Sequence, residues 1–203
     1  MALLDTYDGF IFDYGAVLVG HQAPADEQKL AATAEIPADT FAELYWSTRL
    51  DYDQGLVTGP EYWQRIAKGA GTLFTPATIE RLTEIDTLSW MHYDEVMWEW
   101  IAELRGAGKR VAMLSNMPME LGEALKARTD RLTRFDHVTL SYEVKSVKPE
   151  PAIYEHCLLG LGVVAERSVF FDDRIANCRG AEMLGIHAIE FLNRDAVLAQ
   201  AKA

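Results

Sequence analysis

Three carboxylates in the sequence directly follow apolar runs that are typical of buried strands. Asp13 comes after residues 10–12, and the pair Asp172 and Asp173 comes after residues 169–171. An aspartate can act as a nucleophile that forms a covalent intermediate, which splits one difficult displacement into two easier ones. Like charges placed side by side repel each other, so such a group favours a bound cation. These residues therefore predict nucleophilic chemistry assisted by a metal ion.

Side chains of types that can donate hydrogen bonds to an anion follow at two further places. Ser115 and Asn116 come after the apolar residues 111–114, and Lys148 precedes Pro149. A hydroxyl group, a lysine ammonium and the N–H groups at the start of a helix all donate hydrogen bonds to phosphate oxygens. In an open parallel α/β sheet, ligands bind outside the carboxyl ends of the strands. We therefore expect these side chains and the carboxylates to meet at one edge of a sheet.

The elements that must position these residues alternate between strand and helix over most of the chain. Strands are expected near residues 9–14, 110–115, 137–142, 168–172 and 187–192. Helices are expected near residues 94–105, 118–128, 150–160, 175–184 and 194–202. This order is typical of an α/β fold with a parallel sheet and right-handed crossovers.

The segment 19–90 breaks the alternation, because it contains no convincing strand. Helical patterns occur in it near residues 24–34, 39–50, 60–68 and 77–87. The sequence therefore predicts a helical insertion between the first strand and the rest of the sheet.

Four stretches of the chain resemble the motifs of the haloacid dehalogenase superfamily, in the order in which that family carries them. They read FIFDYGAVL, VAMLSN, VKPEPAIY and VFFDDRIANCRGAEMLGI, and the match runs from Gly9 to about Phe191. The resemblance implies a three-layer, Rossmann-like α/β core formed by residues 1–18 and 91–203, with a small helical cap formed by residues 19–90. The last two stretches are most similar to the branch that contains bacterial sugar-phosphate phosphatases and the N-terminal domain of soluble epoxide hydrolase.

The same resemblance implies a phosphatase that forms an aspartyl-phosphate on Asp13. It implies a Mg²⁺ ion held by Asp13, the backbone carbonyl of Gly15 and Asp173, with Asp172 holding a coordinated water. Carboxylates, carbonyl groups, water and phosphate oxygens are the ligands that this hard cation prefers. The expected substrate is a small phosphorylated metabolite such as a sugar phosphate.

The remaining motif residues are expected to hold the phosphoryl group. By resemblance, Ser115 and Lys148 donate hydrogen bonds to the phosphate, and Lys148 also keeps Asp13 in register with it. Asn116 is a further phosphate-binding candidate, although it could instead buttress a loop, and the same alternative applies to Asn177. Lys145 lacks the motif context and is expected to be exposed.

Position 15 departs from the pattern of many phosphatases of this family, which carry a second Asp there. Gly15 has no proton for the departing oxygen, and general acid–base help is worth roughly 10²–10⁴-fold. Turnover is therefore expected to be slow or restricted to good leaving groups.

This departure keeps two other interpretations open. A 2-haloacid dehalogenase is one alternative, because a halide leaves without a proton. Against it, residues 14–16 replace the Tyr-Gly-Thr stretch that is typical of those enzymes, and the paired acids Asp172 and Asp173 are retained. A non-catalytic module that binds a phosphorylated metabolite is the other.

The cap is expected to select the substrate, although no single residue in it stands out. His21 and the turn formed by residues 51–55 are candidates to face the site. The five tryptophans are expected to pack in the core or between the domains; they are Trp46, Trp63, Trp90, Trp98 and Trp100.

Composition limits the partners and the location. The 203 residues include 19 basic and 31 acidic side chains, and the net charge of −12 argues against a nucleic acid or an acidic membrane as partner. The first residues show no basic segment followed by a long apolar one, and no apolar stretch is long enough to span a bilayer. Cys157 and Cys178 are expected as buried free thiols. We therefore expect a cytoplasmic monomer or homodimer.

Overall fold

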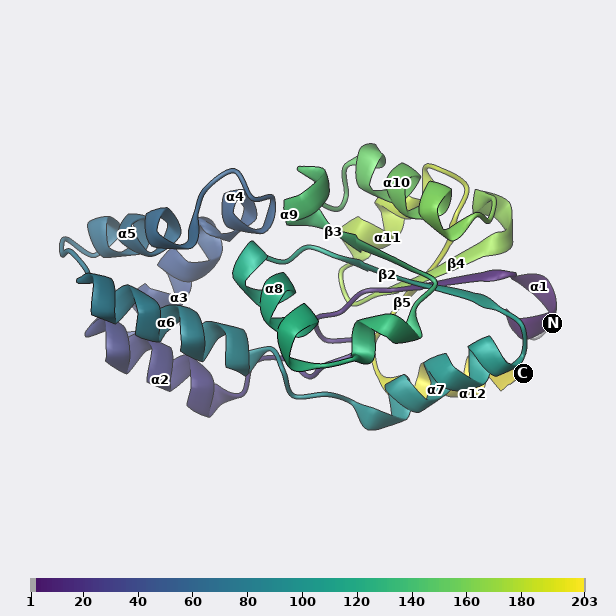
Figure 1. Ribbon diagram of the computed structural model, residues 1–203, viewed down its shortest axis with the longest axis horizontal. Coiled ribbons are helices and arrows are strands. Elements are labelled where there is room, and N and C mark those ends of the chain that lie inside the picture. The colour runs from purple at the N-terminus through teal and green to yellow at the C-terminus, as the bar shows by residue number, and fades with distance from the viewer. Residues whose placement is uncertain (1–2, 203) are drawn as a thin grey trace.

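Five parallel strands form the centre of the molecule (Figure 1). The computed structural model describes residues 3–202. The strands are β1 (Gly9–Phe12), β2 (Arg110–Ser115), β3 (His137–Leu140), β4 (Ser168–Asp172) and β5 (His187–Glu190), in the spatial order β3-β2-β1-β4-β5. Strand β1 lies between β2 and β4, with Phe12 opposite both Met113 and Phe171. The carboxyl ends of the three central strands therefore lie side by side, and the predicted parallel α/β sheet is confirmed.

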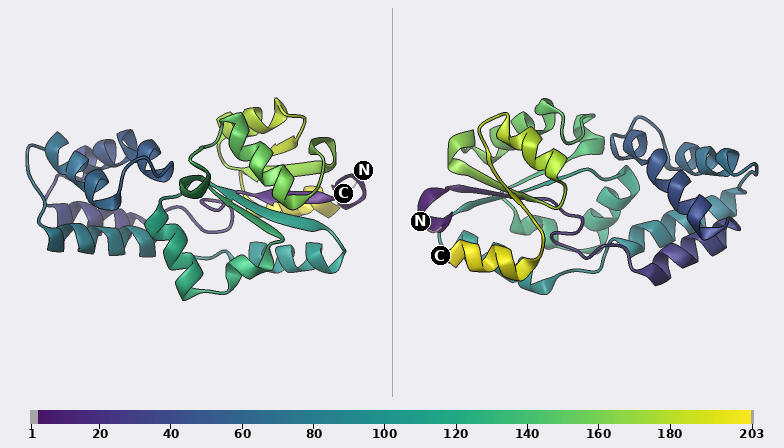
Figure 2. Two further views of the ribbon diagram at one scale, coloured as in Figure 1. Left: turned by 45° about the horizontal axis from the view of Figure 1, so that its top comes forward. Right: turned by 180° about the vertical axis from the view of Figure 1, so that it is seen from behind.

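Helices cover both faces of this sheet, which gives three layers (Figures 1 and 2). Phe10 and Phe12 belong to the apolar cluster on one face, whereas Ile11 belongs to the cluster on the other face. Successive side chains of a strand point to opposite faces, so a strand that is covered on both sides is apolar throughout. This is the physical reason for the uninterrupted apolar runs in the sequence.

The first face is covered by α7 (Glu95–Gly106), α8 (Met119–Arg128) and α12 (Arg194–Lys202), and the second by α10 (Pro151–Leu161) and α11 (Ile175–Glu182). Shorter elements complete the sheet-containing part: α1 (Leu3–Thr6), α9 (Ser141–Val144) and the 3-10 helices η1 (Arg131–Arg134) and η2 (Ala165–Arg167). Several strands are shorter than predicted. The strand expected over residues 137–142 ends at Leu140, because Ser141 begins α9.

A second group of helices, which we call the helical unit, lies between β1 and β2 in the sequence. It consists of α2 (Pro24–Ala34), α3 (Ala38–Ser47), α4 (Arg49–Asp53), α5 (Gly59–Gly69) and α6 (Pro76–Ser89). The unit lies at the end of the molecule opposite to α1 (Figures 1 and 2). It packs around an apolar cluster of its own, in which Tyr62 and Trp63 are fully buried. The predicted helical insertion is therefore present, whereas its role as a substrate-selecting cap and the division at residues 18 and 91 stay predictions.

The helix predicted over residues 39–50 is in fact two helices, α3 and α4, separated at Thr48. The Thr48 hydroxyl donates a hydrogen bond to the carbonyl oxygen of Leu44 at 2.8 Å. A threonine that bonds back to the preceding turn tends to bend a helix. The short α4 then brings Asp53 toward the sheet, where the carbonyl oxygen of Asp53 accepts a hydrogen bond from Ser141 Oγ.

Two adjacent chain segments connect the helical unit to the sheet. Val19 on the outgoing segment forms an isolated antiparallel bridge with Tyr93 on the returning one. The N–H of Gly20 donates to the carbonyl oxygen of His92 at 3.0 Å, and the N–H of Asp94 donates to that of Leu18 at the same distance. The chain therefore enters and leaves the unit at one place.

Two expectations from composition concern features outside the sheet. Cys157 in α10 and Cys178 in α11 are buried free thiols, as predicted. Among the helices of residues 3–202, none combines the length and the apolar character needed to cross a membrane.

Candidate active site

Asp13 is the first residue after the central strand β1. Its backbone N–H donates to the carbonyl oxygen of Phe171 in β4 at 2.9 Å, and its Oδ1 accepts from the N–H of Tyr14 at 2.7 Å. Three residues later the chain turns, and Ala16 has a φ of 59°, a left-handed conformation that costs a non-glycine residue roughly 1 kcal/mol. The Asp13 side chain is 11% exposed. Its carboxylate is thus held at the edge of the sheet, where a small ligand can reach it.

Lys148 joins the ends of three strands through its ammonium group. Its Nζ lies 2.7 Å from Asp13 Oδ1 and 2.7 Å from Asp172 Oδ2, and it donates to the carbonyl oxygen of Leu114 at 3.1 Å. All three protons of the ammonium therefore have acceptors. Burial lowers the pKa of Lys148, but attraction to the two carboxylates outweighs it and holds this pKa above its ordinary value. Lys148 is therefore a fixed positive charge beside Asp13.

Asp13, Asp172 and Asp173 form a cluster that could hold a metal ion. One oxygen of each carboxylate lies within 4.8 Å of one oxygen of the other two. Burial raises the pKa of Asp13 to about 7; Lys148 acts against this, and Asp172 adds to it. Burial and the charge of Asp172 also raise the pKa of Asp173. A divalent cation among these carboxylates would offset both the burial cost and the repulsion.

The two members of the acidic pair have different surroundings. Asp172 is fully buried, and its oxygens accept from the N–H of Arg174 at 2.8 Å and from Asn177 Nδ2 at 2.9 and 3.1 Å, in addition to the contact with Lys148. Asp173 is half-buried and lines the cavity described below. The Asn177 side chain therefore helps to orient the Asp172 carboxylate.

Ser115 and Asn116 lie at the end of β2. The Ser115 hydroxyl has no strong hydrogen-bond partner, whereas the Asn116 amide is fully engaged. Ser115 is buried, and its hydroxyl makes a single long contact of 3.5 Å with the carbonyl oxygen of Asn116. The Asn116 amide is engaged at both ends: Oδ1 accepts from the N–H of Lys148 at 2.8 Å and Nδ2 donates to the Lys148 carbonyl oxygen at 3.1 Å. Of the two alternatives for the Asn116 side chain, this geometry favours the loop buttress.

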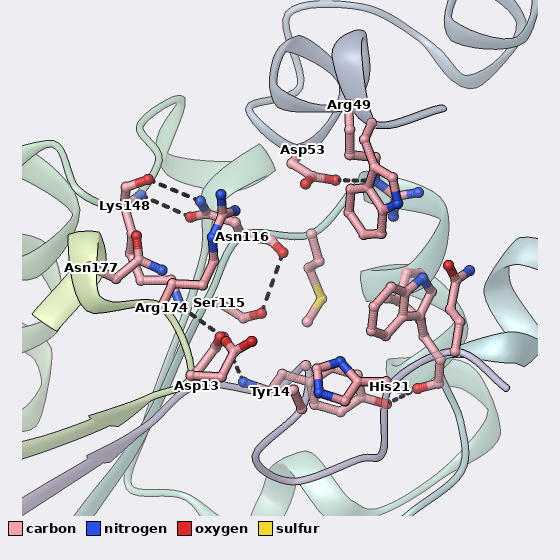
Figure 3. A pocket seen from close by; sticks show the side chains of 18 of the residues that line it. Asp13, Tyr14, His21, Arg49, Asp53, Ser115, Asn116, Lys148, Arg174 and Asn177 are labelled. Atoms are coloured by element: carbon pink, nitrogen blue, oxygen red, sulfur yellow. Dashed lines mark hydrogen bonds and ion pairs between the residues drawn. The ribbon is translucent and has the colours of Figure 1, made fainter. Parts of the chain in front are cut away.

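A cavity of about 580 Å³ opens between the sheet and the helical unit. Figure 3 shows Asp13, Ser115 and Lys148 on one side of it, and Arg49 and Asp53 on the opposite side. Its lining residues are Asp13, Tyr14, Gly15, Ala16, His21, Gln22, Glu27, Trp46, Arg49, Leu50, Asp53, Trp90, Ser115, Asn116, Met117, Leu121, Lys148, Asp173, Arg174 and Asn177. The residues proposed from the motifs therefore share one cavity, except that the buried Asp172 lies behind it.

The two cap candidates named from the sequence also line this cavity. His21 is exposed there. Asp53, in the predicted turn, is the last residue of α4, and its Oδ1 lies 2.7 Å from Arg49 Nε. Lys145 is exposed, as predicted, and its Nζ donates to the carbonyl oxygen of Gly55 at 2.7 Å.

Gly15 leaves space close to Asp13 in the cavity. A Cβ atom there would lie 3.4 Å from the nearest atom of the Trp90 ring, and Gly15 is not among the residues with positive φ. A side chain is therefore compatible with the backbone at this position. The second acid of the first motif is absent without any conformational need for glycine.

Sequence reasoning missed two features of the cavity. Arg174 directly follows the acidic pair, is exposed, and extends into the cavity toward Lys148 and Asn116 (Figure 3). Its position after Asp173 was the only available signal. The expectation that the tryptophans pack in the core or between the domains is confirmed for the buried Trp63, Trp98 and Trp100. Trp46 packs edge to face on Trp90 but is 52% exposed and lines the cavity.

The chain is similar to solved structures over nearly its whole length. A haloacid dehalogenase family enzyme of Bacteroides thetaiotaomicron in complex with magnesium aligns with a TM-score of 0.75 at 20% identity, covering 91% of this chain and 92% of that one. The L-2-haloacid dehalogenase of Xanthobacter autotrophicus with covalently bound chloropropionic acid aligns with a TM-score of 0.70 at 17% identity, covering 95% and 81%. At these identities the likeness establishes a shared fold.

Comparison of amino-acid sequences identifies the family to which the chain belongs. The sesquiterpene phosphatase astK of Aspergillus oryzae is 24% identical over 190 residues, which cover 92% of each protein. Residues 7–185 match the model of the haloacid dehalogenase-like hydrolases. This match spans the strands β1 to β4, the helical unit and the candidate site residues from Asp13 to Asn177. The chain therefore belongs to the haloacid dehalogenase-like hydrolase family.

Proposed function

We propose that this hydrolase is a Mg²⁺-dependent phosphatase that cleaves a small phosphate monoester through an aspartyl-phosphate on Asp13. The observation that carries the proposal is the position of Asp13, which lies 2.7 Å from Lys148 Nζ and within 4.8 Å of carboxylate oxygens of Asp172 and Asp173. A nucleophilic carboxylate that faces an anionic phosphate needs such positive charge around it. The relative named as a phosphatase supports the same reaction class.

The donor set fits Mg²⁺. We assign Asp13, the backbone carbonyl of Gly15 and Asp173 as direct ligands, with Asp172 acting through a water molecule. Asp172 already accepts hydrogen bonds on both oxygens, which supports its indirect role. These are hard oxygen donors of the kind that Mg²⁺ prefers. When bound, the ion offsets the repulsion between nucleophile and phosphate and polarises the phosphoryl oxygens.

The residues of the chain carry out the reaction in two steps. A carboxylate oxygen of Asp13 attacks phosphorus while the bond from phosphorus to the ester oxygen breaks. Lys148 holds Asp13 in position, and Ser115 donates a hydrogen bond to a phosphoryl oxygen. Water then attacks the phosphorus of the aspartyl-phosphate and releases phosphate and the Asp13 carboxylate. The departing ester oxygen takes its proton from water, or from one of the ionisable residues of the cavity, His21 or Asp53.

The helical unit is proposed to act as the cap that selects the substrate. It supplies one wall of the cavity through Trp46, Arg49, Leu50 and Asp53, and His21 on the segment that leads into the unit lines the cavity as well. The two buried free thiols support action in the reducing cytoplasm. A small phosphorylated compound is the expected partner.

The dehalogenase alternative shares the fold and the attacking aspartate. The carboxylates Asp172 and Asp173 argue against it, because without a cation they would repel an anionic haloacid. The deciding experiment measures phosphate release from p-nitrophenyl phosphate and from a panel of metabolite esters, with Mg²⁺ and with excess chelator, beside chloride release from 2-chloropropionate. Mg²⁺-dependent phosphate release supports the proposal. Chloride release without phosphatase activity would establish the dehalogenase. The absence of both activities would favour the non-catalytic binding module.

A further inference from the structure

The wall of the cavity that the helical unit contributes exposes two large apolar side chains. Trp46 is 52% exposed and Leu50 is 54% exposed, and both line the cavity. Leaving such side chains in water forgoes the stabilisation that burial of a large apolar side chain provides. Apolar side chains that gather in a concave site, rather than singly on the outer surface, indicate a ligand that covers them.

This apolar wall begins beside the nucleophile. The Trp90 ring lies next to Gly15, close enough that a Cβ there would be 3.4 Å away. The Trp90 and Trp46 rings meet edge to face with centroids 6.4 Å apart. Met117 and Leu121, which follow Ser115 in the chain, line the cavity as well. An apolar surface therefore extends from the phosphate end of the cavity out to Trp46 and Leu50.

The two indole rings are held in place without a ligand. Trp46 packs edge to face on Tyr45 with centroids 4.9 Å apart. Trp90 Nε1 donates to Tyr45 Oη at 3.4 Å, and Tyr14 Oη donates to the Trp90 carbonyl oxygen at 2.7 Å. A wall that is ordered before binding loses little conformational entropy when a substrate arrives.

The buried and half-buried polar side chains of the same wall are already paired within the protein, whereas His21 and Glu27 are exposed. Arg49 contacts Asp53 at 2.7 Å and Asp86 at 3.0 Å, and it also donates to Tyr45 Oη. Gln22 donates to Ser89 Oγ at 2.8 Å. A sugar with several hydroxyl groups needs donors and acceptors that are not already engaged, because unpaired polar groups at a binding site cost affinity. The stretch of wall around Trp46 and Leu50, where the polar neighbours Arg49 and Asp53 are paired with each other, is therefore better suited to an apolar group than to a sugar.

We infer that the substrate is a phosphate monoester whose organic group is apolar, either aliphatic or aromatic, and lies against Trp46, Leu50 and Trp90 while the phosphate occupies the Asp13 end. This inference rests on the proposed phosphatase activity and replaces the expectation of a sugar phosphate. The cavity volume of about 580 Å³ lies within the range of sites that enclose small organic molecules.

The first test compares hexyl phosphate with glycerol 3-phosphate. The leaving group of each ester is a primary alkoxide, and the release of phosphate is measured in the presence of Mg²⁺. We expect kcat/KM to be at least about tenfold higher for hexyl phosphate. Equal or lower kcat/KM for hexyl phosphate overturns the inference and leaves the phosphatase proposal intact. Failure to hydrolyse any ester, p-nitrophenyl phosphate included, contradicts the phosphatase proposal itself.

A binding measurement separates the two proposals further. Hexylphosphonate and methylphosphonate have no ester bond to hydrolyse, and calorimetric titration of wild-type protein with each gives their affinities in the presence of Mg²⁺. The hexyl compound should bind at least about tenfold more tightly. Equal affinities overturn the inference whether or not the protein is a phosphatase.

Variants of the wall provide the matched control. Trp46→Ala and Leu50→Ala should each lower the ratio of kcat/KM for hexyl phosphate to that for glycerol 3-phosphate by about tenfold, whereas Trp46→Phe should keep most of it. Leu73→Ala removes an exposed leucine of the same helical unit that does not line this cavity, and should leave the ratio unchanged. Circular dichroism and thermal melting establish that each variant is folded. An unchanged ratio in folded Leu50→Ala and Trp46→Ala contradicts the inference.

Discussion

Asn116 holds the backbone of Lys148 through both ends of its side-chain amide, at 2.8 Å and 3.1 Å. The residues are 32 positions apart in the chain, and the pair of hydrogen bonds joins the end of β2 to the loop before α10. Lys148 in turn places its ammonium between Asp13 and Asp172. Asn116 therefore fixes the backbone of Lys148, whose ammonium contacts Asp13, the proposed nucleophile.

Loss of the Asn116 amide should impair the site more than it impairs the fold. Asn116→Ala removes two hydrogen bonds, so we expect the free energy of unfolding to fall by about 1–3 kcal/mol and kcat to fall at least about tenfold. Asn193→Ala is the control, because Asn193 accepts one hydrogen bond from the N–H of Ala196 at an exposed helix start and is not among the residues that line the cavity. Urea unfolding and steady-state kinetics measure both effects. A kcat equal to that of wild type would show that Lys148 keeps its position without Asn116.

The nucleophile assignment is tested by Asp13→Asn. An amide is neither an adequate nucleophile nor an anionic ligand for Mg²⁺, so turnover should fall by a factor of about 10⁴ or more while the fold is retained. Asp39→Asn, which changes an exposed aspartate of α3, should keep wild-type activity. Phosphate release and circular dichroism are the measurements. Substantial activity of Asp13→Asn in a preparation free of wild-type protein would place the chemistry elsewhere.

Removal of the metal ion should abolish activity and lower stability together. Mg²⁺ that binds only the folded carboxylate cluster raises the melting temperature by mass action, and about 2.7 kcal/mol of stabilisation is expected at a concentration 100 times the dissociation constant. Asp173→Asn should weaken this dependence, since it removes a proposed ligand. Thermal melts across a Mg²⁺ titration, with and without chelator, measure the effect. Full activity in excess chelator would refute the metal assignment.

The absence of an acid at position 15 should make the rate depend steeply on the leaving group. An aryl phosphate should react far faster than an alkyl phosphate of similar affinity, because its oxygen departs without a proton. Gly15→Asp should restore part of the rate for the alkyl ester, since the backbone at Gly15 tolerates a side chain. A series of esters with different leaving-group pKa values gives the slope. A flat series, with the first chemical step shown by burst kinetics to limit the rate, would mean that another residue supplies the proton; His21 and Asp53 would then be tested first.

A pair of histidines away from the site should make stability depend on pH. The Thr139 hydroxyl lies 3.0 Å from His137 Nε2 and 3.1 Å from His156 Nδ1, and the two rings are 5.4 Å apart. Burial, with a smaller effect of the charge on His156, holds the pKa of His137 below its ordinary value of 6.5. The folded protein therefore binds fewer protons at His137 than the unfolded chain does just below pH 6.5.

The sign of the effect follows from this difference. The stability linked to neutral His137 is fully present above pH 6.5 and is lost as the pH falls through the lower pKa of the folded state. His137→Gln should flatten the dependence of the unfolding free energy on pH over this range, whereas His187→Gln, at an exposed position of β5, should leave it unchanged. Urea unfolding at a series of pH values measures the slope. A slope that is identical in wild type and His137→Gln would exclude His137 as its source.

The sequence alone was sufficient to predict the parallel sheet and the position of the carboxylates at its edge. Strands such as β1 and β4 are covered on both faces, so they must be apolar throughout, and the polar residue that ends each run marks the carboxyl end of the strand. Because parallel strands end at one edge, Asp13 and the pair Asp172 and Asp173 had to come close together once β1 and β4 were neighbours. Local pattern and the rules of parallel sheets therefore determined this part of the site.

Only the tertiary structure decided what the helical unit contributes. Trp46 and Leu50 have the apolar character of core residues, and their exposure in the cavity depends on the break at Thr48 and on how the unit sits against the sheet. Likewise, no local pattern shows that Asn116 holds Lys148 rather than a phosphate. The periodicity of the sequence shows which face of an element is apolar. Whether that face is covered or exposed depends on packing between segments that are far apart in the chain.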